Sequence, residues 1–226
     1  LCAAIAGALL SIIFAVLTQF MMSNQVATGL GLTMVGLGLS ALIGKPYEGI
    51  KSPTLTKFEI PFLSDIPILG PMFFSHDAIV YLSILVVAVV ALIVNKTRWG
   101  LVLRAVGENQ EAAHALGYRV VRIRFIAIMF GGAMAGLGGA YISLARVPQW
   151  TEGMTAGAGW IALALVVFAS WKPWRVLIGA YLFGGITVLQ LNLQAIGVAI
   201  PVEILSMSPY LVTIVVLVGI SLFGRH

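Results

Sequence analysis

The chain has 226 residues, of which 60% are hydrophobic and 9% are charged. Soluble domains carry about 25% charged residues, and a soluble fold of this size could not bury so much apolar surface. The composition therefore argues against a cytosolic enzyme, a disordered chain and a nucleic-acid-binding protein. The single cysteine, Cys2, excludes an internal disulfide and a cysteine-rich metal site.

Seven hydrophobic segments follow one another along the chain, and a membrane-spanning helix needs about 20 apolar residues. The segments are 2–21, 25–43, 78–94, 125–145, 159–171, 174–191 and 209–224. The fifth is too short to span alone. We predict an all-α, polytopic transmembrane helix bundle with about seven hydrophobic helices, forming a single domain over 1–226. The chain begins with Leu1 inside a hydrophobic run, so we expect it to lack an N-terminal part.

The loops between these segments differ in charge when they are placed alternately on two sides. One side carries nine Lys or Arg: Lys96, Arg98, Arg104, Arg119, Arg122, Arg124, Lys172, Arg175 and Arg225. The other side carries four: Lys45, Lys51, Lys57 and Arg146. Because basic loops stay in the cytoplasm, we predict that loop 95–124 is cytoplasmic and that loop 44–77 is external.

The external loop 44–77 contains five prolines, which forbid a continuous helix, and also many apolar residues. We expect either a lid packed over the helix ends or a docking surface for an external partner.

Small residues recur at a spacing of four in the segment 131–140, which places Gly132, Gly136 and Gly139 on one stripe. Such a stripe lets another helix approach closely. We expect similar packing at Ala27, Gly29, Gly31 and Gly36 of the second segment. The alternative is a seam that slides during a conformational cycle.

Groups that would carry chemistry or ion coupling are absent from the sequence. No predicted span has an acidic or basic residue at its middle, and such residues usually mark proton or ion paths. The sequence has neither an HExxH motif nor a GxxxxGK[ST] phosphate loop. An enzyme and a proton-coupled carrier are therefore disfavoured, and any ATP that is used must be hydrolysed by another subunit.

Within the predicted cytoplasmic loop 95–124, residues 109–117 have the features of a short helix. Asn109 is a good N-cap, Glu111 suits the first turn, and Gly117 is a fitting stop. Ala112 and Ala113 favour helix. Because two turns of helix are unstable alone, this helix must dock on something, and Leu116 offers one apolar contact. It fits the groove of a cytoplasmic partner; the alternative is an ordinary helix on the membrane surface.

The run Gly107-Glu108-Asn109-Gln-Glu111-Ala-Ala-His-Ala-Leu-Gly117, followed by 119–124, resembles the coupling loop of ABC importer permeases. The whole chain is similar to the ribose/branched-chain amino acid permease superfamily, and within it to the simple-sugar and nucleoside permeases paired with basic membrane lipoproteins. Further matching pieces are 24–29, 64–70, 152–157, 159–164, 171–174, 183–185 and 189–190. The chain departs from the family in its missing N-terminal segment and at Ala158, where a polar or basic residue is expected.

This resemblance implies a non-enzymatic permease subunit, without a cofactor, in the plasma (inner) membrane of a bacterium or archaeon. It implies pairing with a second permease subunit, as a homodimer or heterodimer. It also implies an ABC ATPase docked on 107–118 and an external lipoprotein that delivers a nucleoside or sugar. Alternating access would be driven by ATP.

A polar solute needs polar side chains along its path. Candidates are Asn24, Gln25, Thr28, Gln190 and Asn192, with Trp160 as a stacking surface. Amides in lipid must be paired, so Asn24 and Gln25 bond either to freed backbone groups or to the solute. The competing hypothesis for the whole chain is a secondary carrier or channel without an ATPase, which has no need of a docking helix at 107–118.

Overall fold

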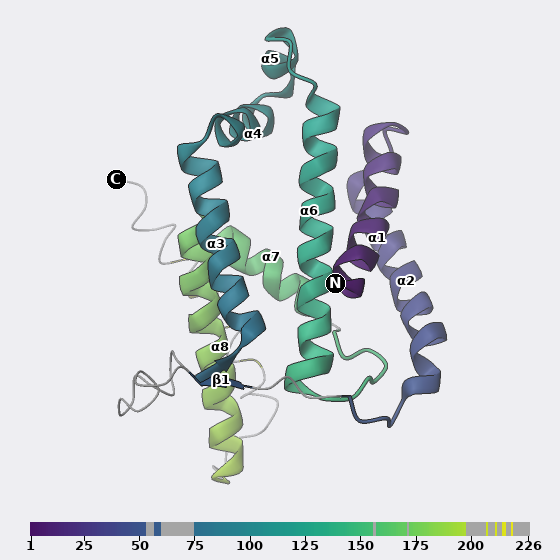
Figure 1. The fold of residues 1–226 in the computed structure, drawn as a ribbon, viewed down its shortest axis with the longest axis vertical. Helices are drawn as coiled ribbons and strands as arrows, with labels where there is room; N and C mark the ends of the chain where they lie inside the picture. Colours follow the sequence, from purple (N-terminus) through teal and green to yellow (C-terminus); the bar gives the residue numbers. More distant parts are fainter. Residues whose placement is uncertain are drawn as a thin grey trace. The chain divides into compact units, whose positions relative to one another are not determined.

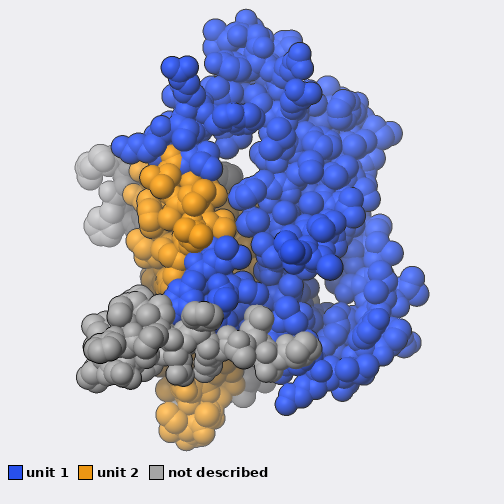
Figure 2. Space-filling model, viewed as in Figure 1, with its two compact units in different colours: residues 1–83, 93–156 blue, residues 84–92, 157–226 orange. Residues whose placement is uncertain are grey.

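The computed structural model describes residues 1–52, 57–59, 75–155, 157–170 and 172–197, together with Met207, Leu211, Ile214, Val215 and Val218. The chain divides into two compact units, coloured separately in Figure 2. Unit 1 comprises residues 1–83 and 93–156, and unit 2 comprises residues 84–92 and 157–226.

The fold is almost entirely helical (Figure 1). The long helices are α1 (Cys2–Gln19), α2 (Gln25–Gly44), α3 (Ala78–Lys96), α6 (Val120–Tyr141) and α8 (Pro173–Ala195). The shorter ones are α4 (Arg98–Glu108), α5 (Gln110–Ala115) and α7 (Ala158–Phe168). A 3₁₀ turn, η1 (Lys45–Tyr47), extends α2, and a π turn, η3 (Ile142–Arg146), extends α6. Two three-residue strands, β1 (Lys57–Glu59) and β2 (Ser75–Asp77), pair antiparallel.

Five helices in the described residues are long and apolar enough to cross a membrane, which confirms the all-α polytopic bundle. The predicted count of about seven is only approximate. Helix α7 has 11 residues; at 1.5 Å per residue it is too short to cross about 30 Å of hydrocarbon. The predicted segment 209–224 lies largely outside the described residues, as does most of loop 44–77.

The main contact within unit 1 joins α1 and α6 along their length, and glycines bring the two backbones together. A methyl group added to Gly7 would lie 3.0 Å from the Gly136 Cα atom and would overlap the Gly132 carbonyl oxygen. One added to Gly136 would overlap the carbonyl oxygen of Ala3. We call this contact the α1–α6 seam. Only glycine allows so close an approach of two helices.

At the far end of α6, the chain after η3 returns to the chain after α2. The Ser52 N–H donates to the Pro148 carbonyl at 2.8 Å, and β-bridges join Glu48 to Trp150 and Lys51 to Gln149. A side chain at Gly44, the last residue of α2, would overlap the indole ring of Trp150. The two loops therefore lie side by side at one end of unit 1.

In unit 2, α7 and α8 form a helical hairpin. Ala169 is fully buried at the turn, and Ser170 adopts a positive φ of 48°. Gly179 of α8 faces α7, since an added methyl group would lie 2.7 Å from the Phe168 ring. Pro173 stands in the first turn of α8, where its missing N–H costs nothing.

Candidate functional site

The predicted cytoplasmic loop contains an amphipathic helix, α4, which sequence analysis did not separate from the rest of the loop. The Thr97 hydroxyl caps it by accepting a hydrogen bond from the Gly100 N–H at 3.1 Å. Gly100 is buried against the end of α3, where a side chain would overlap the carbonyl oxygens of Ile93 and Val94. This close approach turns the chain sharply out of α3 and starts α4.

Helix α5 follows α4 after a single extended residue, Asn109, whose φ is −147°. The Asn109 side-chain oxygen accepts a hydrogen bond from the Ala112 N–H at 3.0 Å, so Asn109 is the N-cap. Gly117, with φ at +84°, follows the helix, and its N–H donates to the His114 carbonyl at 2.9 Å. A side chain would strain this conformation, which is why the helix stops here.

One face of α5 is held by its own chain. Ala113 is 2% exposed and lies in an apolar cluster with Val106 of α4 and Ile123 of α6. Val102, Leu103 and Val120 pack around this cluster. We call residues 97–124 the coupling region. Its short helix is stabilised by these contacts, because two turns would not persist alone.

The other face of α5 is open. Leu116 is 74% exposed. The remaining predicted coupling residues other than Ala113 are also exposed: Gly107, Glu108, Asn109, Glu111, Ala112 and Gly117. The arrangement presents an apolar side chain at the tip of a small, internally supported helix.

The break between α1 and α2 is tied together by hydrogen bonds. The Asn24 side-chain oxygen accepts from the N–H groups of Val26 and Ala27 at 3.0 and 3.1 Å, capping α2. The Ser23 hydroxyl donates to the Leu17 carbonyl at 2.9 Å. The hydroxyls of Ser23 and Thr28 lie 2.8 Å apart. Of the two roles considered for Asn24, the structure places its oxygen on backbone groups.

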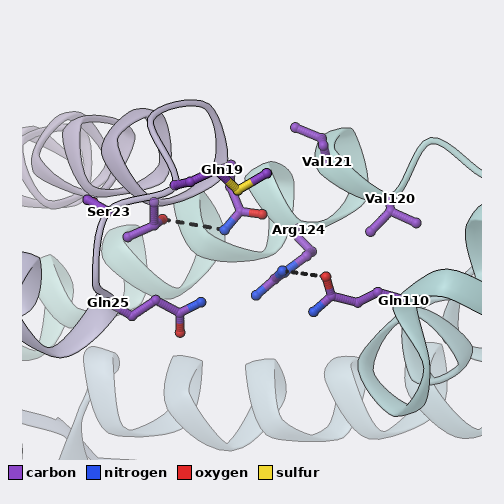
Figure 3. A pocket seen from close by; sticks show the side chains of 9 residues that line it. Gln19, Ser23, Gln25, Gln110, Val120, Val121 and Arg124 are labelled. Atoms are coloured by element: carbon purple, nitrogen blue, oxygen red, sulfur yellow. Dashed lines mark hydrogen bonds between the residues drawn. The ribbon is translucent and has the colours of Figure 1, made fainter.

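This break and the coupling region together line a cavity of about 340 Å³ (Figure 3). The lining residues are Thr18, Gln19, Met22, Ser23, Gln25, Gln110, Val120, Val121 and Arg124. The Arg124 guanidinium donates to the Gln110 side-chain oxygen at 2.9 Å, which links α6 to α5. Gln25, one of the predicted substrate-path residues, therefore lies at the cavity, next to Asn24.

Of the other predicted substrate-path residues, Thr28 lies in α2 of unit 1, and the remaining three lie in unit 2. Trp160 is 69% exposed on α7, and Asn192 is exposed on α8, which also carries Gln190. The predicted packing glycines divide as well: Gly132 and Gly136 face α1, whereas nothing described lies within 4 Å of a methyl group built on Gly139.

Comparison with known protein families identifies the family of this chain. Residues 1–219 match the model of the branched-chain amino acid transport system / permease component family. The chain belongs to this family. It is a multi-pass plasma-membrane protein and a permease of the ABC transporter type.

Three relatives are similar over nearly the whole chain. "Putative glucose ABC transporter permease protein TsgC13" of Haloferax volcanii is 40% identical, over 93% of this chain and 71% of that protein. Guanosine ABC transporter permease protein NupQ of Bacillus subtilis is 36% identical, over 97% and 71%. Nucleoside ABC transporter permease protein NupC of Lactococcus lactis is 33% identical, over 95% and 70%. No solved structure matches the chain.

Sequence reasoning did not find the cavity. Val120 and Val121 precede Arg124 by four and three residues on α6, which is a signal that each lies beside Arg124 on the helix surface. The contact between Gln110 and Arg124 has no such signal in the sequence, because it depends on the turn at Gly117.

Proposed function

We propose that this chain is the translocation subunit of an ATP-driven importer for nucleosides or simple sugars. A partner ABC ATPase docks on α5 and supplies the energy. A second permease subunit, of the same or a related chain, completes the pathway, and an external lipoprotein delivers the solute. The subunit itself hydrolyses nothing.

The geometry of α5 carries this proposal. The helix is capped at Asn109, stopped at Gly117 and held from one side through Ala113, while Leu116 remains 74% exposed. An exposed leucine at the tip of a helix that is held on its other face suits an apolar pocket in a partner, since a few buried side chains contribute most of an interface's binding energy.

The contacts of α5 also offer a route by which motion reaches the membrane. Ala113 touches α4 and α6, and Gln110 bonds Arg124 of α6. Helix α6 is joined to α1 through the seam at Gly132 and Gly136. A displacement of α5 by the ATPase would therefore move α6 and α1 together. Alternating access can be driven in this way without an ion site in the membrane.

The substrate class rests on the relatives, whose names specify glucose, guanosine and nucleosides. We assign Asn24, Gln25, Thr28, Trp160, Gln190 and Asn192 to the substrate path as candidates. Transport of labelled guanosine and labelled glucose into vesicles holding the complete transporter would decide between the two classes.

The experiment that tests the coupling role is Leu116→Asp. Loss of an anchor residue at an interface costs about 2 kcal/mol or more, equivalent to roughly 30-fold in affinity. We expect the variant to insert normally, to lose the co-purifying ATPase and to lose ATP-driven uptake. Leu116→Met, which keeps an apolar side chain of similar volume, should retain both. Unchanged ATPase binding and uptake in Leu116→Asp would overturn the docking role of this helix tip.

The proposal also requires α5 to lie in the cytoplasm. In a background with Cys2 replaced, we expect Ser52→Cys to react with a membrane-impermeant thiol reagent in intact cells. Gln110→Cys should react only after permeabilisation, because basic loops remain inside. Reaction of Gln110→Cys in intact cells would invert the orientation and remove α5 from reach of any ATPase.

A further inference from the structure

The cavity of about 340 Å³ beside the α1–α2 break contains a cation with unused donors. The Arg124 side chain extends into it between Gln25 and Gln110 (Figure 3). A guanidinium has five N–H donors, and one of the Arg124 nitrogens donates to Gln110 at 2.9 Å. Neither acidic residue of the coupling region, Glu108 or Glu111, lines the cavity. The site is therefore positively charged.

The side-chain amides of the lining can also donate hydrogen bonds. Three side-chain amides, Gln19, Gln25 and Gln110, surround the guanidinium. The hydroxyls of Thr18 and Ser23 also line the cavity, but they donate to the carbonyls of Phe14 and Leu17. Gln19 is only 9% exposed, and its amide nitrogen makes a long hydrogen bond of 3.4 Å to the Thr18 hydroxyl. A buried amide held this weakly can turn toward a ligand. Arginine with several neutral donors is a donor set that suits phosphate oxygens.

The cavity lies where spanning helices end. Helix α1 stops at Gln19 and α6 starts at Val120, so the lining occurs at the level of the lipid headgroups. Apolar side chains continue from it: Met22 is 84% exposed, Met21 68% and Val121 42%. A molecule with a phosphate and an adjoining apolar chain would match both parts. Basic pockets on the cytoplasmic side of membrane proteins suit anionic headgroups.

We propose that this cavity binds a phosphate group on Arg124, Gln19, Gln25 and Gln110, and that the bilayer supplies it as the headgroup of an anionic phospholipid. Because Gln110 belongs to α5 and Gln25 to α2, the bound phosphate would bridge the coupling helix to the α1–α2 break. This assignment goes beyond the proposed transport function, since it concerns a lipid and is read out without ATP. Soluble phosphate offers the same oxygens, and the test separates the two sources.

The test uses the full-length permease, purified in its transporter complex, delipidated and titrated with phosphatidylglycerol under native mass spectrometry. Diacylglycerol, which lacks the phosphate, is titrated in parallel, as is inorganic phosphate by calorimetry. We expect phosphatidylglycerol to bind more tightly than diacylglycerol. We expect Arg124→Gln to weaken its affinity at least about tenfold, equivalent to about 1.4 kcal/mol. Arg124→Lys should retain most of the affinity, which a purely structural role of the guanidinium would not produce.

Arg122→Gln is the matched control, because it removes the same charge from an exposed position outside the lining, two residues away. The affinity of Arg122→Gln for phosphatidylglycerol should equal that of the wild type. Arg124-dependent binding of inorganic phosphate but not of the lipid would support the phosphate site and overturn the lipid source. Equal binding of phosphatidylglycerol and diacylglycerol would overturn the proposal. Equal losses of phosphatidylglycerol affinity in Arg122→Gln and Arg124→Gln would also overturn it. Unchanged phosphatidylglycerol binding by a folded Arg124→Gln variant would do the same.

Discussion

Helix α6 makes two contacts of different kinds within unit 1. At its middle, Gly132 and Gly136 bring its backbone against α1. At its start, Ile123 contacts Ala113 of α5 through side chains in a small apolar cluster. The seam has no room for a side chain at these glycines, whereas α5 is held by a few side chains, the Asn109 cap and the Arg124–Gln110 hydrogen bond. Closely packed interfaces resist continuous deformation, but short helices with few contacts open easily.

The difference indicates how one helix can serve both regions. The α1–α6 seam makes a stiff pair of spanning helices, and the coupling region is a lightly held attachment at its end. Under the proposed function, a partner docked on α5 would displace it at low cost, and the α1–α6 pair would carry the displacement. Three substitutions test this division, beginning with the one of largest effect.

The largest loss should come from Gly136→Leu, which places a side chain between α6 and α1. Overpacking costs about 1–3 kcal/mol, and the upper end applies because the obstructing atom is the backbone carbonyl oxygen of Ala3. Thermal unfolding in detergent should show a clear drop in stability. Gly139→Leu, on the same helix but with nothing described within 4 Å, is the control and should unfold near the wild-type temperature. Equal losses of thermal stability in the two variants would contradict the close packing of α6 against α1 at Gly136.

A smaller and local loss should follow from Ala113→Leu. The added atoms would enter the cluster between Val106 and Ile123, where Ala113 is 2% exposed. We expect a cost of about 1 kcal/mol, at the low end of overpacking, because exposed α5 can shift. Hydrogen exchange should increase in the coupling region and stay unchanged at the seam. Ala112→Leu, one residue away and exposed, should leave exchange unaltered; protection changes along α1 would contradict the independence of the regions.

The smallest change should come from Asn109→Ala, which removes the N-cap of α5. Loss of such a cap costs roughly 1 kcal/mol or less in an exposed helix. Limited proteolysis should cut faster near α5, while the melting temperature of the whole protein barely moves. Asn109→Ser keeps a capping oxygen and should restore resistance. Resistance that stays high in Asn109→Ala would mean that the apolar cluster alone holds the helix.

Much of the fold was predictable because hydrophobic length is a strong signal. Helices α1, α2 and α3 begin and end within about two residues of their predicted limits. Helix α6 starts at Val120, five residues before its predicted start at 125. The early start runs through Arg122 and Arg124, which a helix tolerates at a membrane surface, where long basic side chains reach water. The prediction counted only apolar residues, so it left these two arginines outside the helix.

The glycine positions show where sequence reasoning stops. Spacing of four predicted packing stripes on both the second and the fourth segment. On α6 the stripe at Gly132 and Gly136 meets Gly7 of α1, which sequence analysis had not singled out. On α2, a methyl group added to Gly29 would lie 3.8 Å from the Phe14 ring, and one added to Gly31 or Gly36 would meet no described atom within 4 Å. Spacing identifies a surface that permits close approach, but the partner helix decides whether the approach occurs.

The cavity was out of reach for a related reason. Its polar groups were visible as single residues, and Gln25 was recognised as a polar candidate between the first two segments. Their association with Arg124 requires the α1–α6 seam, which sets α1 beside α6, and the turn at Gly117, which returns Gln110 to α6. Both are tertiary relations over many residues.

The pairing of loops 48–52 and 148–150 has a consequence for the integrity of the chain. Helix α2 is joined to α1 covalently through Met22 and Ser23, and it is joined to the end of α6 by the Ser52–Pro148 hydrogen bond and the two β-bridges. Together with the α1–α6 seam, these links close a ring of α1, α2 and α6. The covalent α1–α2 linker is only one of the connections in this ring. A break in the polypeptide at Met22 would open the ring at one point and leave α2 tethered at its other end. We therefore expect a chain cut in the α1–α2 linker to keep α1 on α6 through the seam and α2 on the end of α6 through the Ser52–Pro148 pairing.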